Sequence, residues 1–144
     1  MSDAIGKEKI GVRLSPFSKL GDLVEYDEEE THNTYVRLAE QLDEFQIAYL
    51  HIAVNAPIPA KTFQAIRNHF SRSIILANGL NAETAEEALH AGFADLVAFG
   101  RPFLSNPDFL ERIKANAALN PVDYNTLYTP GARGYTDYPC FSDH

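Results

Sequence analysis

The order of apolar and polar positions predicts short buried strands that alternate with amphipathic helices. Four short apolar runs can form strands, at residues 10–14, 47–54, 73–77 and 94–99. The run at 47–54 is almost continuously apolar, which is typical of a parallel strand that is covered on both faces. Apolar side chains recur at helical spacing in four other segments, at residues 29–45, 59–70, 81–91 and 107–117.

Capping residues support two of these helices. Asn81 is a good N-cap for the helix that ends near residue 91, and Gly92 is a typical stop. For the last helix we predict Asn106 as the N-cap, Pro107 at the first position and Asp108 in the first turn. The sequence therefore predicts clean starts for both helices.

The alternation predicts an α/β protein with a parallel sheet and right-handed crossovers. Two architectures fit four strand and helix pairs. One is a small doubly wound sheet, which the pattern alone favours by a small margin because it is complete at this length, and the other is half of an eight-stranded (β/α) barrel. Because no Gly/Ser-rich linker divides the chain, we expect a single domain over residues 1–144, with an aromatic C-terminal tail over residues 121–144.

Composition narrows the class of protein. A chain of 144 residues with 45% hydrophobic residues argues against disorder, and a net charge of −8 argues against a nucleic-acid surface. No run approaches the roughly 18 consecutive apolar residues of a membrane span, and the first residues resemble no secretion signal. A single cysteine, Cys140, rules out an internal disulfide and suits a reducing cytosol. We therefore expect a soluble cytoplasmic protein that binds neither nucleic acid nor membrane.

The run from Asp95 to Asp108 carries the first candidate site. It joins an apolar strand, a Gly100-Arg101 turn and a helix start. The missing Cβ of Gly100 lets backbone N–H groups approach an anion, and Arg101 can add a charge-assisted hydrogen bond. These residues are consistent with a phosphate cradle, and equally with a routine loop between a strand and a helix.

Five segments then occur in the order in which the Old Yellow Enzyme family has them. They are GVRLSPF at residues 11–17, AYLHI at 48–52, ANG at 77–79, FGRPF at 99–103 with NPD at 106–108, and GYTDYP at 134–139. The chain resembles the C-terminal half of that family, and most closely its bacterial N-ethylmaleimide-reductase-like ene-reductases. The resemblance extends from about Lys9 to the end of the chain.

This resemblance implies a (β/α)8 TIM barrel of which the chain supplies strands five to eight. It also implies FMN as cofactor, NAD(P)H as reductant and an activated alkene as substrate. Arg13 matches the family's arginine beside the N1 and O2 edge of the flavin. Asn78 and Gly79 match the phosphate-binding loop after strand seven, and Gly100 and Arg101 match the loop after strand eight. These positions agree with a general property of TIM barrels, in which the loops after the last two strands often bind phosphate.

Three further side chains are candidates. Tyr128 matches a family tyrosine near flavin and substrate, which makes it a catalytic candidate, although it could also pack on the barrel wall. We interpret His51 as a hydrogen-bonded residue of the barrel interior rather than an acid or a metal ligand, and we expect no metal site. Cys140 has no visible base partner and is interpreted as unreactive.

The resemblance does not cover the family's strands one to four, which carry the groups that anchor the substrate carbonyl and donate the proton. We therefore expect low activity from this chain alone. Half a barrel leaves apolar strand faces and sheet edges without cover, which predicts self-association, a complementary N-terminal half barrel or a C-terminal tail that lies across the uncovered face. Two other functions stay open, a non-catalytic FMN or phosphate-binding module and a subunit-contact fragment.

Overall fold

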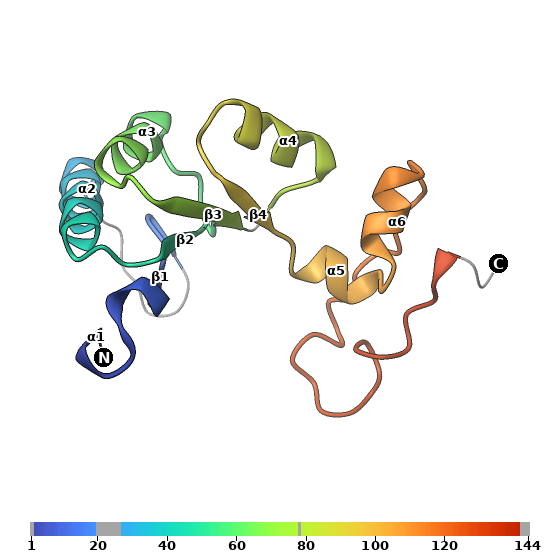
Figure 1. Cartoon of the computed structure of the whole chain (residues 1–144). Helices are drawn as coiled ribbons and strands as arrows, with labels where there is room; N and C mark the ends of the chain where they lie inside the picture. The colour runs from blue at the N-terminus through green and yellow to red at the C-terminus, as the bar shows by residue number, and fades with distance from the viewer. Residues whose placement is uncertain (1, 20–26, 78, 142–144) are drawn as a thin grey trace. The chain divides into compact units, whose positions relative to one another are not determined.

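The structure is a computed structural model that describes residues 2–19, 27–77 and 79–141 (Figure 1). The chain divides into two compact units, Met1–Ala98 and Phe99–His144. Each unit is described by itself, and the single domain over residues 1–144 stays a prediction. No helix of the described ranges has the length and apolar character needed to cross a bilayer.

The first unit contains a parallel sheet of four strands in the order β1-β2-β3-β4. The strands are β1 (Gly11–Leu14), β2 (Tyr49–Ala53), β3 (Ser73–Ala77) and β4 (Leu96–Ala98). The connecting helices are α2 (Glu28–Glu44), α3 (Ala60–His69) and α4 (Ala82–His90), and the short α1 (Ser2–Ile5) and η1 (Lys7–Lys9) precede β1. Neighbours in this sheet are also neighbours in sequence, as in a barrel, whereas a doubly wound sheet reverses its strand order. The observed order therefore supports the half barrel.

The core lies between one face of the sheet and the helices, which lie along that side in Figure 1. Alternate strand residues such as Leu50, Ile52 and Ile74 are fully buried there, against Ile66 and Phe70 of the α3 region. The opposite face, here called the open face, carries Tyr49 and His51, and none of α2, α3 and α4 covers it among the described residues. The prediction that the strand at 47–54 is covered on both faces therefore holds for one face, and on the other face only at Ala53, which is fully buried.

Most predicted boundaries agree with the structure to within about two residues, as expected at element ends. Asn81 caps α4 as predicted, since its side chain accepts a hydrogen bond from the Thr84 N–H at 2.8 Å. Gly92 follows the helix with a φ of 71°.

The predicted start of the last helix, with Asn106 as its N-cap, is wrong. Helix α6 spans Phe109–Lys114, and the preceding α5 (Arg101–Ser105) was not predicted. Asn106 is fully buried at the end of α5 and does not cap α6, because its amide nitrogen donates to the Pro102 carbonyl and its amide oxygen accepts from the Asn120 N–H. The side chain that the capping pattern assigned to α6 forms a tertiary hydrogen bond with Asn120 instead.

The second unit packs around Phe109, whose ring lies 5.0 Å from the ring of Phe99. Its chain end is tied to α6 by Arg112, which is 4% exposed. The guanidinium donates to Asp108 Oδ1 at 2.7 Å and to the Pro139 carbonyl at 3.0 Å. The described part of the predicted tail, residues 121–141, is thus bonded to helix α6 of this unit.

Candidate functional site

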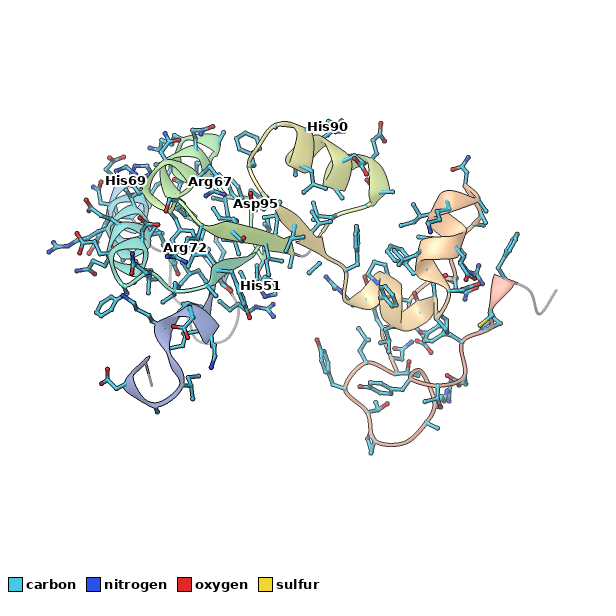
Figure 2. The ribbon with its side chains drawn as sticks, in the orientation of Figure 1. His51, Arg67, His69, Arg72, His90 and Asp95 are labelled. Carbon is cyan, nitrogen blue, oxygen red and sulfur yellow. The ribbon has the colours of Figure 1, made fainter. Side chains whose placement is uncertain are left out.

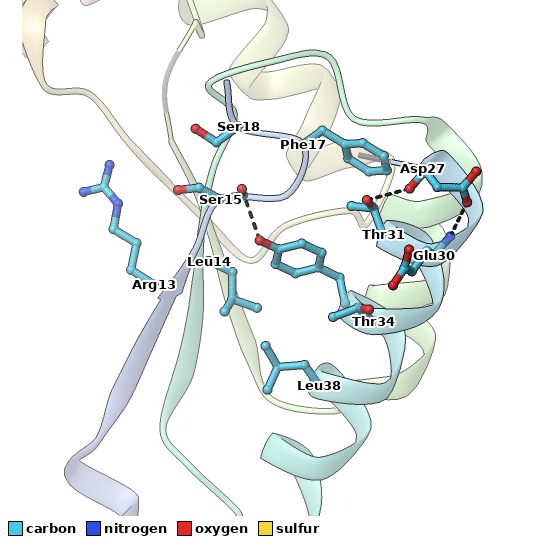
Figure 3. Close-up of a pocket in the computed structure, with 11 residues that line it drawn as sticks. Arg13, Leu14, Ser15, Phe17, Ser18, Asp27, Glu30, Thr31, Thr34 and Leu38 are labelled. Atoms are coloured by element: carbon cyan, nitrogen blue, oxygen red, sulfur yellow. Dashed lines mark hydrogen bonds between the residues drawn. The ribbon is translucent and has the colours of Figure 1, made fainter. Parts of the chain in front are cut away.

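Arg13 lies near the carboxyl end of β1, and its side chain is exposed. Figure 3 shows its guanidinium on the opposite side of β1 from Leu14 and Leu38. The ion pairs found among the described residues use Lys61, Arg67, His90 and Arg112 as their cations, and not Arg13. The open sheet face therefore presents a cation with no carboxylate partner in the described part of the chain.

His51 is the direct neighbour of Arg13 across the β1 and β2 pair. Its Nε2 atom is buried and has no hydrogen-bond partner among the described residues. The expectation of a hydrogen-bonded His51 is therefore wrong at Nε2, since the sequence gives no information on what faces that atom. Burial, and then the charge of Arg13, lower the pKa of His51 below 6.5. Both effects favour the uncharged imidazole, so Arg13 is the fixed cation of this strand pair.

A hollow of about 570 Å³ lies between the end of β1 and the start of α2 (Figure 3). Two of the polar side chains that line it serve local structure. The Asp27 side chain accepts the Glu30 N–H at 2.8 Å and so caps α2, and the Tyr35 hydroxyl donates to the Ser15 carbonyl at 3.3 Å. Arg13 is among the residues that line this hollow, and in the figure its guanidinium points to the side of β1 opposite Leu14.

Gly79 follows β3 with a φ of 72°, in the left-handed region that favours glycine. A Cβ built at this position would meet no atom within 4 Å, so the space around it is open. An apolar hollow of about 290 Å³ adjoins it, lined by Leu76, Leu80, Phe63 and Phe93 among others. Asn78, the other predicted residue of this turn, lies outside the described residues.

Gly100 and Arg101 belong to the second unit, where Gly100 immediately precedes α5. Gly100 has a φ of −95°, which any residue can adopt, and an added Cβ would again meet nothing within 4 Å. Neither its backbone nor the described atoms around it therefore require glycine. Arg101 is exposed, with its guanidinium carbon 5.9 Å from the centre of the Tyr124 ring. This contact was not predicted, because an aromatic residue 23 positions away carries no local signal.

Tyr128 is 92% exposed and has a φ of 64°. Its backbone N–H donates to the hydroxyl oxygen of Tyr135 at 2.7 Å. The phenol is therefore presented by an ordered loop, and it does not pack against the second unit. The role of Tyr135 was missed, although the GYTDYP motif that contains it was noted.

No cluster of three or more potential metal ligands is found within the described ranges. Arg13 and Gly79 of the first unit fit the anionic groups of a flavin phosphate cofactor, because Arg13 supplies a positive charge that forms no ion pair among the described residues and Gly79 an open backbone position. Gly100 and Arg101 of the second unit offer a second open backbone position beside an exposed arginine. The chemistry of the predicted residues is thus compatible with FMN at each place taken separately.

Comparisons with known proteins identify the family to which the chain is similar. The model of the NADH:flavin oxidoreductase / NADH oxidase family matches residues 1–120. A 12-oxophytodienoate reductase-like protein of Solanum lycopersicum is 36% identical over 140 residues, which are 96% of this chain and 38% of the relative. The 12-oxophytodienoate reductase 2 of Arabidopsis thaliana is 34% identical over 143 residues, which are 94% of this chain and 37% of the relative.

Solved structures agree. Morphinone reductase superposes with a TM-score of 0.87 at 36% identity, covering 99% of this chain and 39% of its own. The old yellow enzyme from Trypanosoma cruzi gives a TM-score of 0.85 at 30% identity, with 97% of this chain and 37% of its own covered. The chain thus spans about two-fifths of the length of its relatives, which are TIM barrels, and the predicted half barrel is confirmed. The family implies a flavin and a nicotinamide reductant. This chain belongs to the NADH:flavin oxidoreductase / NADH oxidase family, the family of the old yellow enzymes.

Proposed function

We propose that the chain is the flavin-binding C-terminal half of an NAD(P)H-dependent ene-reductase that reduces activated alkenes. The observation that carries the proposal is Arg13, an exposed guanidinium without a carboxylate partner among the described residues. FMN, when bound, supplies the hydride chemistry of such a reaction. Every other step of the proposal concerns the residues of this chain.

Arg13 would lie against the N1 and O2 edge of the flavin. Negative charge builds up at this edge on reduction, and a fixed cation stabilises it more strongly in a site that excludes water. The lowered pKa of His51 supports this assignment, because it favours an uncharged imidazole beside Arg13. A cation that cannot lose its proton at physiological pH suits this role.

The phosphate would be held by backbone N–H groups at Asn78 and Gly79 and by Gly100 and Arg101. Gly79 and Gly100 each come two residues after the end of a parallel strand, β3 and β4 respectively. Carboxyl ends of strands are where barrels of this kind bind phosphate. Open space around both glycines, and a backbone at Gly100 that does not itself need glycine, favour close approach of a ligand.

Tyr128 would contact the alkene or the flavin as a catalytic residue, since its phenol is free of packing contacts within the second unit. The groups that polarise the alkene carbonyl would come from a complementary N-terminal half barrel, or from a second copy of the chain. Losing such preorganised donors costs about 10²–10³ in rate each. We expect the chain alone to turn over at less than roughly a hundredth of the rate of a complete ene-reductase.

The test is a titration of the chain with FMN, followed by flavin fluorescence. Arg101→Ala and Arg13→Ala should each weaken binding by about 1.5–3 kcal/mol, the scale of a charge-assisted hydrogen bond. Arg37→Ala is the matched control, because Arg37 is an exposed arginine of α2. Equal affinities of all three variants and the unmodified chain would contradict the site.

A second measurement separates an ene-reductase component from a pure binding module. The FMN-loaded chain is supplied with NADPH and N-ethylmaleimide without oxygen, and nicotinamide absorbance is followed with and without a complementary N-terminal half. Slow turnover that rises when the half is added supports the reductase. FMN binding without any NADPH oxidation under either condition would favour the binding module.

A further inference from the structure

Two tyrosine hydroxyls hold the loop that presents Tyr128. The hydroxyl oxygen of Tyr135 accepts the Tyr128 N–H at 2.7 Å, and that of Tyr138 accepts the Asp123 N–H at 2.9 Å. Both tyrosines belong to the GYTDY segment at residues 134–138. One short segment therefore fixes the loop at its beginning and at Tyr128.

The backbone of Tyr128 needs such support. Its φ of 64° lies in the left-handed region, which is unfavourable for a residue with a Cβ and persists only where the surroundings impose it. Packing of the ring does not impose it, because the residue is 92% exposed. The hydrogen bond to Tyr135 acts directly on the Tyr128 amide and so on this dihedral angle.

Tyr135 is itself held in place. Gly134, with a φ of 78°, lies so close to Thr126 that an added Cβ would be 2.1 Å from the threonine Oγ1. The Gly134 N–H donates to Asp137 Oδ1 at 2.7 Å, and the Tyr135 N–H donates to the Ala132 carbonyl at 3.0 Å. Thr126 is 6% exposed, and its hydroxyl donates to the Asp123 carbonyl at 2.9 Å. The two arms of the loop are therefore packed together, which fixes where the Tyr135 hydroxyl can reach.

We propose that Tyr135 is a positioning residue for Tyr128. By accepting the Tyr128 N–H it keeps the backbone left-handed, and this conformation directs the Tyr128 phenol into solvent, where a ligand can meet it. The use of that phenol rests on the proposed function, whereas the conformational control does not. Tyr138, which makes the same kind of bond five residues earlier in the loop, does not control Tyr128.

The first test is structural and needs no ligand. A left-handed φ brings the amide and α protons of a residue close together, so Tyr128 should show a strong intraresidue amide to α-proton NOE. Tyr135→Phe, which removes only the accepting oxygen, should abolish the strong NOE. Tyr138→Phe is the matched control and should leave it intact. An unchanged NOE in Tyr135→Phe would overturn the proposal.

A measurement on the unmodified chain guards against a variant that fails to fold. The Tyr128 amide should exchange slowly with deuterated solvent, because its N–H is bonded although its side chain is exposed. Exchange as fast as that of an unbonded surface amide would also overturn the proposal.

The second test is functional and separates this inference from the proposed function. FMN affinity is measured for Tyr128→Ala, Tyr135→Phe and the double variant. If Tyr135 acts through Tyr128, both single variants weaken FMN binding and the double variant is no weaker than Tyr128→Ala. Additive losses would show that Tyr135 acts independently and would overturn the positioning role. No effect of Tyr128→Ala would refute the proposed use of Tyr128, and the NOE would still decide the positioning.

Discussion

Tyr128 and His51 are each in a state that is energetically unfavourable for an isolated residue. Tyr128 is exposed in a backbone conformation that costs an L-residue about 1–2 kcal/mol. His51 has a buried nitrogen without a described partner, next to the charge of Arg13. Such costs are tolerated where the surroundings fix the residue, and they cluster at functional sites. Both states give predictions that need no ligand.

At Tyr128 we expect glycine to be better tolerated than alanine. Tyr128→Gly removes the left-handed penalty, and Tyr128→Ala keeps it, while both remove a side chain that is 92% exposed. The glycine variant should be more stable than the alanine variant by about 1 kcal/mol, measured by urea unfolding. The same pair at Arg133, which is exposed and lacks a positive φ, should give the opposite order. Equal stability of the two Tyr128 variants would argue against the left-handed conformation.

At His51 we expect a stability that falls on acidification. Because the folded pKa is lower than the ordinary 6.5, the unfolded chain binds the proton more readily below that pH. The free energy of unfolding should therefore decrease as the pH falls below about 6.5, and His51→Gln should flatten this dependence. His90→Gln, at an exposed histidine of α4, is the control. Identical slopes in His51→Gln and the unmodified chain, from urea unfolding between about pH 5 and 8, would refute the assignment.

Among the elements, Asp95 ties three parts of the first unit together (Figure 2). Asp95 directly precedes β4. Its Oδ2 accepts hydrogen bonds from the Arg67 side chain of α3 at 2.8 Å and from the Ile74 N–H of β3 at 2.8 Å. Arg67 also donates to the carbonyl of Arg72 at 2.7 Å. These contacts lie where the chain enters β3 and β4, and that end of a barrel serves stability rather than ligand binding.

Asp95→Asn should therefore destabilise the fold without changing FMN affinity. The loss should be about 1–2 kcal/mol at pH 7, less than the roughly 1.5–3 kcal/mol of a fully buried charge-assisted hydrogen bond, because the Asp95 side chain is 53% exposed. The Ile74 N–H first, and Arg67 next, lower the pKa of Asp95, so its contribution is lost as the pH falls below about 3.9. Glu40→Gln, at an exposed position of α2, should have little effect. Chemical unfolding of both variants and the unmodified chain is measured at pH 7 and at a pH below about 3.9. If Asp95→Asn is still less stable than the unmodified chain at the low pH, the electrostatic origin of the effect is contradicted.

Elements with local signals were predictable from the sequence, and those that depend on distant partners were not. Strand β3 and the Asn81 cap agree with prediction because apolar runs and capping boxes act over a few residues. Asn106 has the same capping signal, but its amide is bonded to Asn120 and Pro102 instead. Tertiary hydrogen bonds of this kind leave no pattern in a single sequence.

For the whole molecule, periodicity alone is compatible with a doubly wound sheet and with half of a (β/α) barrel. The order of the five motifs favours the half barrel. The parallel order β1-β2-β3-β4 agrees with that choice. The positions of Arg13 and Gly79 at strand ends were also predictable, since strands locate loops. The environment of the His51 nitrogen was not, because it depends on whatever faces the open side of the sheet.

That open face gives the last prediction. It carries Tyr49, which is 38% exposed and lies two positions before His51 in β2, and Leu96 of β4, which is 55% exposed. Exposed apolar strand surface favours association, and charged residues on strands oppose it. We expect the isolated chain to sediment as a dimer or larger species at micromolar concentration, and Leu96→Lys to shift it toward the monomer. Leu110→Lys, at a leucine of α6 that is also 55% exposed, should leave the sedimentation unchanged. If both lysine variants sediment alike, the sheet face is not the associating surface. If the unmodified chain is monomeric, the face is left for a complementary half barrel, whose addition should then protect the β4 amides from hydrogen exchange.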